Sequence, residues 1–329
     1  MITGQLIKFG NEKEKLRLSL KLHETAKGTL ISSITVKGRN VNDIEKKILQ
    51  ATDFLISDGL KIIHPVGNPI GMETDLKIDD VLKDMMGEVI RNGKIEIEWI
   101  KIDGGSFMMG SENGDNDEKP IHMVSIKDFY MSKTEVTVGQ YRSCVDVGVC
   151  SKPDSCNWTD DIRDKEDHPI NCVDWKQARR FAKWVGGDLP SEAQWEYASR
   201  SRGKEIKYPW TNTVPTCRIA NYAGCHGKTT PVCSKTAGNS TQGLCDMGGN
   251  VWEWVLDELH MSYHGAPNDD LGWCSNETCE NQHAVSRIAR GGSCYDNASY
   301  LRSTARGYGS KTLRDRGIGF RVLTTNQPN

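Results

Sequence analysis

Residues 287–306 read RIARGGSCYDNASYLRSTAR, and GIGFRV follows at 317–322. Residues 290–293 and 319–321 are predicted to be closing strands of one sheet. This segment predicts how the domain closes at its C-terminal end. Together with the strings that precede it in the chain, it indicates a fold.

Four further strings precede this segment in order. They are IDGGSFMMGS (102–111), KTEVTVGQY (133–141), HPINCVDWKQARRFAKWVGGDLPSEAQWEYASR (168–200) and DMGGNVWEWV (246–255). In the third string Trp175, Ala178 and Phe181 recur at helical spacing before a glycine pair, which predicts an amphipathic helix. Ser191 followed by Gln194 resembles a capping box and predicts a second helix. Thr134 or Thr137 would cap a third helix within 138–148.

Taken in this order, the strings resemble the formylglycine-generating-enzyme family, also called the sulfatase-modifying-factor domain, over about residues 95–323. The resemblance implies an irregular variant of the C-type lectin fold. We therefore expect an α+β chain with a C-type lectin-like domain at 93–329, much of it irregular, preceded by a small α+β domain at 1–92.

The N-terminal region holds no Cys and no Trp. LRLSLKLHE (16–24) alternates apolar and polar residues as a half-buried strand does, and ISSITVKG (31–38) would pair with it in a hairpin. Helical spacing predicts helices within 40–57 and 75–93. Because no clustered His, no Cys and no phosphate-binding loop occurs here, we interpret the region as a spacer or docking module.

All eleven cysteines lie between Cys144 and Cys294. Such clustering is typical of disulfides in an oxidising compartment, of metal sites or of reactive thiols. Short local disulfides such as Cys144–Cys150 and Cys274–Cys279 are plausible, and the odd count leaves at least one thiol without a partner in the chain. The chain starts without an apolar signal core. We expect an exported protein at the cell surface or outer membrane, with any lipid anchor outside this sequence.

The charge balance narrows the class of partner. Forty-two Lys and Arg face 44 Asp and Glu, for a net charge of −2, whereas nucleic-acid and membrane-surface binders carry a basic excess. No apolar run approaches the roughly 20 residues of a membrane span. We therefore expect no nucleic-acid partner, and a membrane link only through such an anchor.

The resemblance also raises the question of catalysis. In oxidising members of the family, two cysteines close together after the GGS string bind copper and activate oxygen. Here Cys294 follows GGS directly and no second Cys follows it. One thiolate cannot make a two-sulfur copper site, so we expect no copper and no catalytic residue. A formylglycine-generating or related oxidoreductase is the alternative.

Calcium is the cofactor that the resemblance implies, at the segment DMGGNVWE. The matching positions supply a side-chain oxygen from Asp246, backbone oxygens from Gly249 and Val251, and the carboxylate of Glu253. Two carboxylates with backbone carbonyls suit a hard cation. A Glu253 that hydrogen-bonds to loop amides would explain the same residues without a metal.

A branch of this lectin-fold family, the variable proteins of diversity-generating retroelements, randomises its C-terminal segment by mutating adenines in Asn-type codons. The chain resembles the treponemal members of this branch, with its variable segment at about 285–323. Every candidate variable residue is of a type that an adenine-mutated AAC or AAT codon can encode. The candidates are Ala289, Cys294, Tyr295, Asp296, Ser299, Tyr300, Ala305, Gly307, Tyr308, Gly309, Ser310, Asp315, Arg316 and Gly317.

This composition suits a binding surface, because tyrosine supplies rigid contact area while serine and glycine supply adaptability. The sequence therefore predicts a surface-displayed, non-catalytic ligand-binding protein whose partner is a protein on a host or neighbouring cell. An ordinary polar loop in a degenerate family member is the alternative interpretation.

Overall fold

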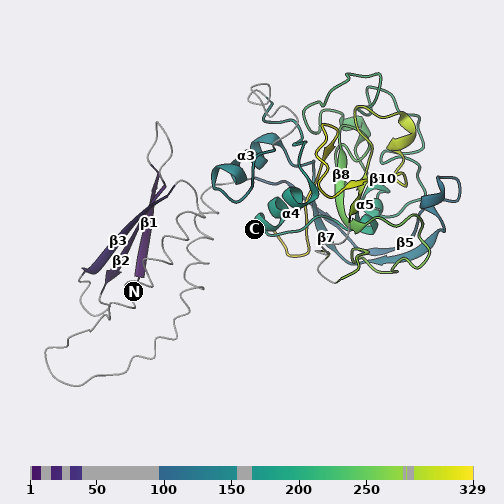
Figure 1. Ribbon diagram of the computed structural model, residues 1–329. Coiled ribbons are helices and arrows are strands. Elements are labelled where there is room, and N and C mark those ends of the chain that lie inside the picture. Colours follow the sequence, from purple (N-terminus) through teal and green to yellow (C-terminus); the bar gives the residue numbers. More distant parts are fainter. Residues whose placement is uncertain are drawn as a thin grey trace. The chain divides into compact units, whose positions relative to one another are not determined.

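A computed structural model describes the backbone of residues 2–8, 16–23 and 30–38, and residues 96–153, 165–276, 279 and 285–328 in full. The chain divides into two compact units (Figure 1). One comprises Met1–Ile95 with Asp146–Val149, and the other comprises Glu96–Val145 with Cys150–Asn329.

The first unit contains an antiparallel sheet in the order β1-β2-β3. Its strands are β1 (Ile2–Lys8), β2 (Leu16–His23) and β3 (Leu30–Gly38). The predicted hairpin is confirmed as the β2–β3 pair, in which Leu16 lies opposite Gly38. Strand β1 was not predicted, and the helices predicted within 40–57 and 75–93 lie outside the described residues.

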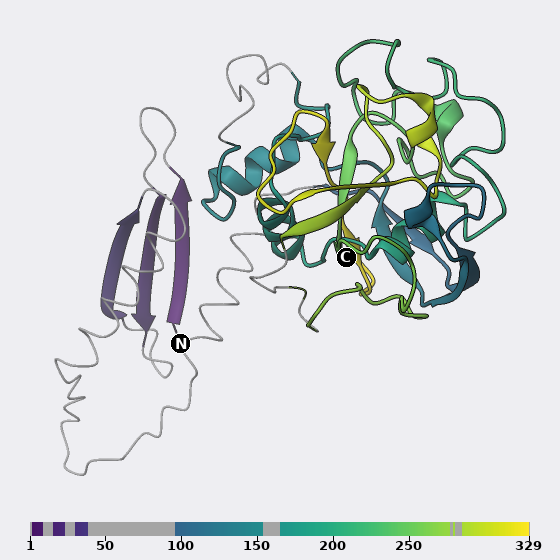
Figure 2. The same ribbon diagram turned by 45° about the vertical axis from the view of Figure 1, so that its right-hand side comes forward.

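The second unit is a lectin-like body of short strands and long loops (Figures 1 and 2). Its four-stranded sheet has the order β10-β9-β8-β11, and two smaller sheets have the orders β12-β7-β4 and β5-β6. The strands are β4 (Trp99–Ile102), β5 (Gly105–Met109), β6 (His122–Ile126), β7 (Phe129–Ser132), β8 (Trp252–Glu258), β9 (Ser286–Arg290), β10 (Arg306–Ser310), β11 (Ile318–Gly319) and β12 (Leu323–Thr324).

The closing strands differ in extent from the prediction. Strand β9 ends at Arg290, because Gly291 (φ 102°) and Gly292 (φ 74°) adopt left-handed backbone angles that cannot continue a strand. The predicted strand at 290–293 was therefore wrong beyond its first residue. At 319–321 only Gly319 is in a strand, at the end of β11, which pairs in parallel with β8; the predicted strand was wrong at residues 320 and 321.

Among its described residues, the second unit also contains three helices with local caps. They are α3 (Val138–Asp146), α4 (Trp175–Trp184) and α5 (Glu192–Ser199), with 3₁₀ turns η1 (Asn116–Glu118), η3 (Thr236–Gly238) and η4 (Ala298–Leu301). The predicted capping box of α5 is confirmed, since Ser191 and Gln194 exchange hydrogen bonds. Thr137 caps α3, because its hydroxyl accepts from the Gln140 amide.

Helix α5 is central to the core, where it packs against β5, β6, β8 and β9. Its Trp195 is fully buried among side chains from all of these elements. Disulfides in the described part of this unit are Cys144–Cys150, which starts in α3, and Cys217–Cys225, Cys233–Cys245 and Cys274–Cys279, which join loops. Two of these are the predicted local pairs, and such a set of disulfides is typical of an exported protein. None of the described helices is both long and apolar enough to cross a membrane.

Candidate functional site

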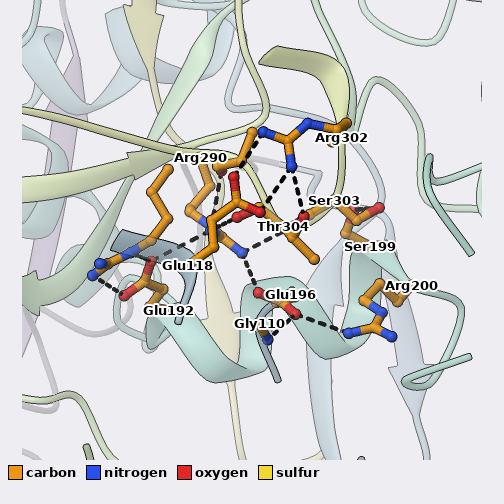
Figure 3. Close-up of polar contacts among 12 residues, drawn as sticks. Gly110, Glu118, Glu192, Glu196, Ser199, Arg200, Arg290, Arg302, Ser303 and Thr304 are labelled. Carbon is orange, nitrogen blue, oxygen red and sulfur yellow. Dashed lines mark hydrogen bonds and ion pairs between the residues drawn. The ribbon is translucent and has the colours of Figure 1, made fainter. Parts of the chain in front are cut away.

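A buried ionic network lies beneath segment 287–306 and connects it to α5 (Figure 3). Arg290 is fully buried, and its guanidinium donates to Glu196 Oε2 at 2.6 Å. It also donates to the carbonyl oxygens of Ser303, Thr304 and Ala305 at 2.9–3.0 Å. One side chain at the start of the segment therefore fixes the backbone near its end.

A second arginine fixes the start of β10. Arg306 donates to both carboxylate oxygens of Glu192, at 2.7 and 3.0 Å, and to the carbonyl oxygens of Asp117 and His260. Burial alone would raise the pKa of Glu192, but Arg306 and Arg290 outweigh it and hold that pKa below its ordinary value. Glu192 is therefore a carboxylate in the folded protein.

The third arginine ties η4 to η1. Arg302 donates to both oxygens of the fully buried Glu118, at 2.7 and 2.8 Å. Such bidentate pairs combine strength with fixed geometry. Together the three arginines hold residues 287–306 to α5 and to residues 110–118, so the backbone path of this segment does not depend on its outward side chains.

The structure divides the fourteen candidate variable positions by exposure. Seven are exposed: Tyr295, Ser299, Tyr300, Tyr308, Ser310, Asp315 and Arg316. Asp296 and Gly307 are partly buried. Five are buried, namely Ala289, Cys294, Ala305, Gly309 and Gly317. In this chain these five residues offer no exposed side chain to a partner, and their role as ligand-binding positions stays a prediction.

Tyr295 and Tyr300 form an aromatic face together with Trp252, which the sequence analysis did not include. Tyr308 points to the other side of the sheet, because its neighbour Gly307 on β10 faces the Trp252 ring. Tyr295, Tyr300 and Tyr308 are 38%, 42% and 56% exposed. The partly buried Trp252 packs edge-to-face against Tyr300, with ring centroids 5.8 Å apart. Arg316 lies over the Tyr295 ring at 4.7 Å. Large aromatic rings with an arginine are typical of protein-binding surfaces.

Three candidate variable positions set the orientation of Trp252. Its indole Nε1 donates to Asp296 Oδ2 at 2.8 Å, and Tyr300 packs against its ring. A Cβ added to Gly307 would lie 2.8 Å from that ring. Residue changes at 296, 300 and 307 would therefore alter how Trp252 is presented. Its place in the string NVWEW, between the predicted cation ligands Val251 and Glu253, gave no sign of this role.

Cys294 is a free thiol with no exposure. Burial raises its pKa to about 12, so the sulfur stays protonated at neutral pH. A protonated, inaccessible thiol is a poor nucleophile and a poor metal ligand.

The four predicted calcium positions lie close together at the start of β8, but their carboxylates already have protein partners. Arg321 donates to both oxygens of Glu253, at 2.6 and 2.7 Å, and Trp195 Nε1 donates to Glu253 Oε2 at 2.7 Å. Asp246 Oδ2 accepts from the Cys233 amide. The loop-amide alternative is therefore wrong for Glu253, whose partners are a guanidinium and an indole.

Within 96–153, 165–276 and 285–328, no three His, Cys, Asp or Glu side chains are grouped so that they could hold a metal ion. A cation at 246–253 would therefore also depend on the carbonyl oxygens of Gly249 and Val251. This is compatible with the predicted ligand set, in which two of the four ligands are backbone oxygens.

Comparison with solved structures supports the lectin-like description. A structure of PvdO from Pseudomonas aeruginosa is 26% identical, with a TM-score of 0.60, over 70% of this chain and 95% of that one. Treponema denticola variable protein 1 is 19% identical, with a TM-score of 0.56, over 71% and 97% of the two chains. The second likeness shows a shared fold.

Sequence relatives include enzymes. The formylglycine-generating enzyme of Streptomyces coelicolor is 26% identical over 68% of this chain and 87% of its own length. A protein of Chlamydia caviae named serine/threonine-protein kinase pkn1 is 27% identical over 84% of this chain, and the chain spans only 50% of its length. Residues 87–326 match the sulfatase-modifying factor enzyme 1-like domain, so this chain belongs to the formylglycine-generating-enzyme family.

Proposed function

We propose that this chain is a non-catalytic, surface-displayed protein that binds a protein ligand, and that a retroelement diversifies its binding face. The observation that carries the proposal is the aromatic face of Tyr295, Tyr300 and Trp252 on a backbone held from beneath by buried arginines. Exposed side chains can change on such a segment without loss of the contacts that fix its path. The partner would be a protein on a host or neighbouring cell, and binding would take place outside the cell that displays this chain.

The chemistry of the segment supports binding over oxidation. Cys294 is the only cysteine among the described residues from 285 to 328, and it is buried and protonated. Asp296, two residues after Cys294, accepts hydrogen bonds from Trp252 and Ser293. We propose no copper, and we propose Ca²⁺ as the cofactor, held by Asp246, Gly249, Val251 and Glu253.

Sequencing sibling genes and the neighbouring genome tests the diversification. We expect an adenine-rich near-repeat of the 3′ coding end, with substitutions between siblings concentrated at the seven exposed positions. Siblings that differ evenly over residues 96–328, with no such repeat nearby, would refute it.

A binding measurement tests the face itself. The full chain is screened against an array of recombinant extracellular host proteins, beside a variant in which Tyr295 and Tyr300 are Ser. We expect specific signals that the double variant loses while it keeps its melting temperature. The enzyme alternative predicts something else: copper-dependent oxidation of a Cys-containing sulfatase peptide, lost in Cys294→Ala.

A further inference from the structure

Strand β10 lies at the edge of the four-stranded sheet, and one of its two sides is open. In the order β10-β9-β8-β11, its strand neighbour among the described residues is β9. The two strands are antiparallel, with Tyr308 opposite Ile288 and Gly309 opposite Arg287. An open edge presents unpaired backbone donors and acceptors, with which a strand of another chain can pair.

The backbone groups of Tyr308 point to the open side of β10. Just beyond the strand, the Lys311 amide donates to the Val285 carbonyl oxygen at 2.9 Å, so residues 311 and 285 form a hydrogen-bonded pair. In an antiparallel ladder such pairs alternate with pairs whose backbone groups face outward. Gly307 and Gly309 therefore bond to β9, and the N–H and C=O groups of Tyr308 face away from it. No described residue forms a backbone hydrogen bond with Tyr308 from the open side.

This edge lacks the features that usually prevent strand pairing, which include lysine, proline and β-bulges. Residues 306–310 contain no lysine and no proline, and their register with β9 is continuous. Arg306 is the charged residue of the strand, but its side chain is buried and paired with Glu192. Tyr308 is 56% exposed. A second strand would therefore meet neither a charge nor a missing donor along this edge.

The strand is also complementary to a second copy of itself. A two-fold axis at Tyr308 would place Tyr308 opposite its own copy and Gly307 opposite Gly309. Each outward N–H of Tyr308 would then donate to the outward C=O of the other Tyr308. Arg306 would lie opposite Ser310, so no like charges would oppose each other. We propose that this chain forms a two-fold symmetric homodimer in which the β10 strands of two copies pair.

The dimer is a further property of the chain and does not depend on ligand binding. A Cβ added to Gly307 would lie 2.8 Å from the Trp252 ring, so the interface adjoins the aromatic face. Pairing would bring the aromatic faces of two copies into one assembly. Two linked binding faces increase avidity for a clustered ligand without any new contact to it. The bonds between the strands use backbone groups, so most substitutions at residues 307–310 would leave them in place.

Sedimentation velocity of the full chain over a range of protein concentrations measures the association. The wild type is compared with Tyr308→Lys and Tyr308→Pro. Lysine would place two like charges opposite each other, and proline would remove the N–H that points to the second copy. Met123→Lys is the matched control, because Met123 is an exposed apolar residue on β6, which belongs to another sheet. The melting temperature of each variant shows whether it is folded.

Engineered cysteines test the register. The Cα atoms of a hydrogen-bonded antiparallel pair are about 5.5 Å apart, which lies within disulfide range. Tyr308→Cys should therefore form a disulfide-linked dimer in oxidised glutathione. Ser310→Cys is the control on the same strand, since its two copies would be offset by roughly 14 Å along the paired strands. The native free thiol, Cys294, is buried and does not compete.

We expect a weak, concentration-dependent dimer, because one short strand buries little area. Tyr308→Lys and Tyr308→Pro should each raise its dissociation constant at least about tenfold, since the two-fold axis doubles every lost contact, and Met123→Lys should not. A monomeric wild type, with no disulfide dimer from Tyr308→Cys, would overturn the proposal and leave the edge to an extended segment of another protein. Equal cross-linking of Tyr308→Cys and Ser310→Cys, or a dimer unchanged in Tyr308→Lys, would also overturn it. The array experiment decides the binding face separately.

Discussion

Replacing Arg290 with Met tests whether the buried network holds the candidate binding segment. Met keeps an apolar stem near Trp195, over which the guanidinium lies at 5.3 Å, and removes the charge. The variant loses the ion pair to Glu196 and the donors to three carbonyl oxygens in 303–305. Breaking a buried pair from one side costs about 3–5 kcal/mol. In the variant Glu196 still accepts hydrogen bonds from Arg200 and from the Gly110 amide, which favours a loss in the lower part of that range. The carbonyl oxygens of residues 303–305 lose their donor, which favours the upper part.

Equilibrium unfolding in urea, followed by tryptophan fluorescence, measures this loss. A loss of about 3–5 kcal/mol would lower the urea midpoint by roughly 1–2 M at ordinary m values. Arg316→Met is the control, because its exposed cation–π contact with Tyr295 contributes about 0.5–1 kcal/mol. A midpoint for Arg290→Met within the range of the Arg316 control would refute the reasoning.

Three further predictions concern neighbouring features. At a pH near 9.0, the ordinary pKa of a thiol, iodoacetamide should leave Cys294 unmodified in the native protein and should label it in denaturant. The reason is that burial raises the pKa of Cys294 to about 12. Labelling of the native protein would contradict the burial of this thiol. The folded thiol keeps its proton to higher pH than the unfolded one, so the free energy of unfolding should fall as pH rises from about 9 to 12, less so in Cys294→Ser. Gly307→Ala should lower the free energy of unfolding by about 1–3 kcal/mol, because the new methyl would lie 2.8 Å from the Trp252 ring. It should also change the near-ultraviolet circular dichroism spectrum. Ser310→Ala is the control, and a Gly307→Ala spectrum that matches the control would count against this packing.

Local sequence signals predicted local structure well. Ser191 and Gln194 are three residues apart, and they form the expected capping box. Cys274 and Cys279 are close in sequence and form the expected disulfide. Both features depend on residues within one turn or one short loop, so the chain needs no knowledge of its tertiary fold to specify them.

The buried network could not be predicted in the same way. Arg290 and Glu196 are 94 residues apart, and Arg302 and Glu118 are 184 residues apart. Periodicity carries no information on such pairs. A partial signal was present in α5, where Glu192 and Glu196 fall four residues apart in a helix that the structure buries on every side. Acidic residues in such a helix require buried cations, and the arginines near the GGS turn are the ones available.

Strand geometry could have predicted which candidate variable positions are exposed and which are buried. Successive side chains of a strand point to opposite faces, so Tyr308 and Ser310 on β10 point outward while Gly309 between them is buried. Codon chemistry alone cannot make this distinction, because it gives residue types without direction. Cys294, by contrast, follows a turn of two left-handed glycines, and its burial required the folded structure.

The anchoring contacts explain how a diversified face would keep its shape. Arg290 donates to the carbonyl oxygens of residues 303–305, and Arg306 donates to those of Asp117 and His260. Because every residue type carries a carbonyl, substitutions at the exposed positions leave these bonds in place. Asp296 and Gly307 act differently. The Asp296 side chain accepts a hydrogen bond from the Trp252 indole, and Gly307 has no side chain, which leaves room for the Trp252 ring. Under the proposed function, changes at these two positions would move a fixed aromatic ring and so reshape the face beyond the residue that changed.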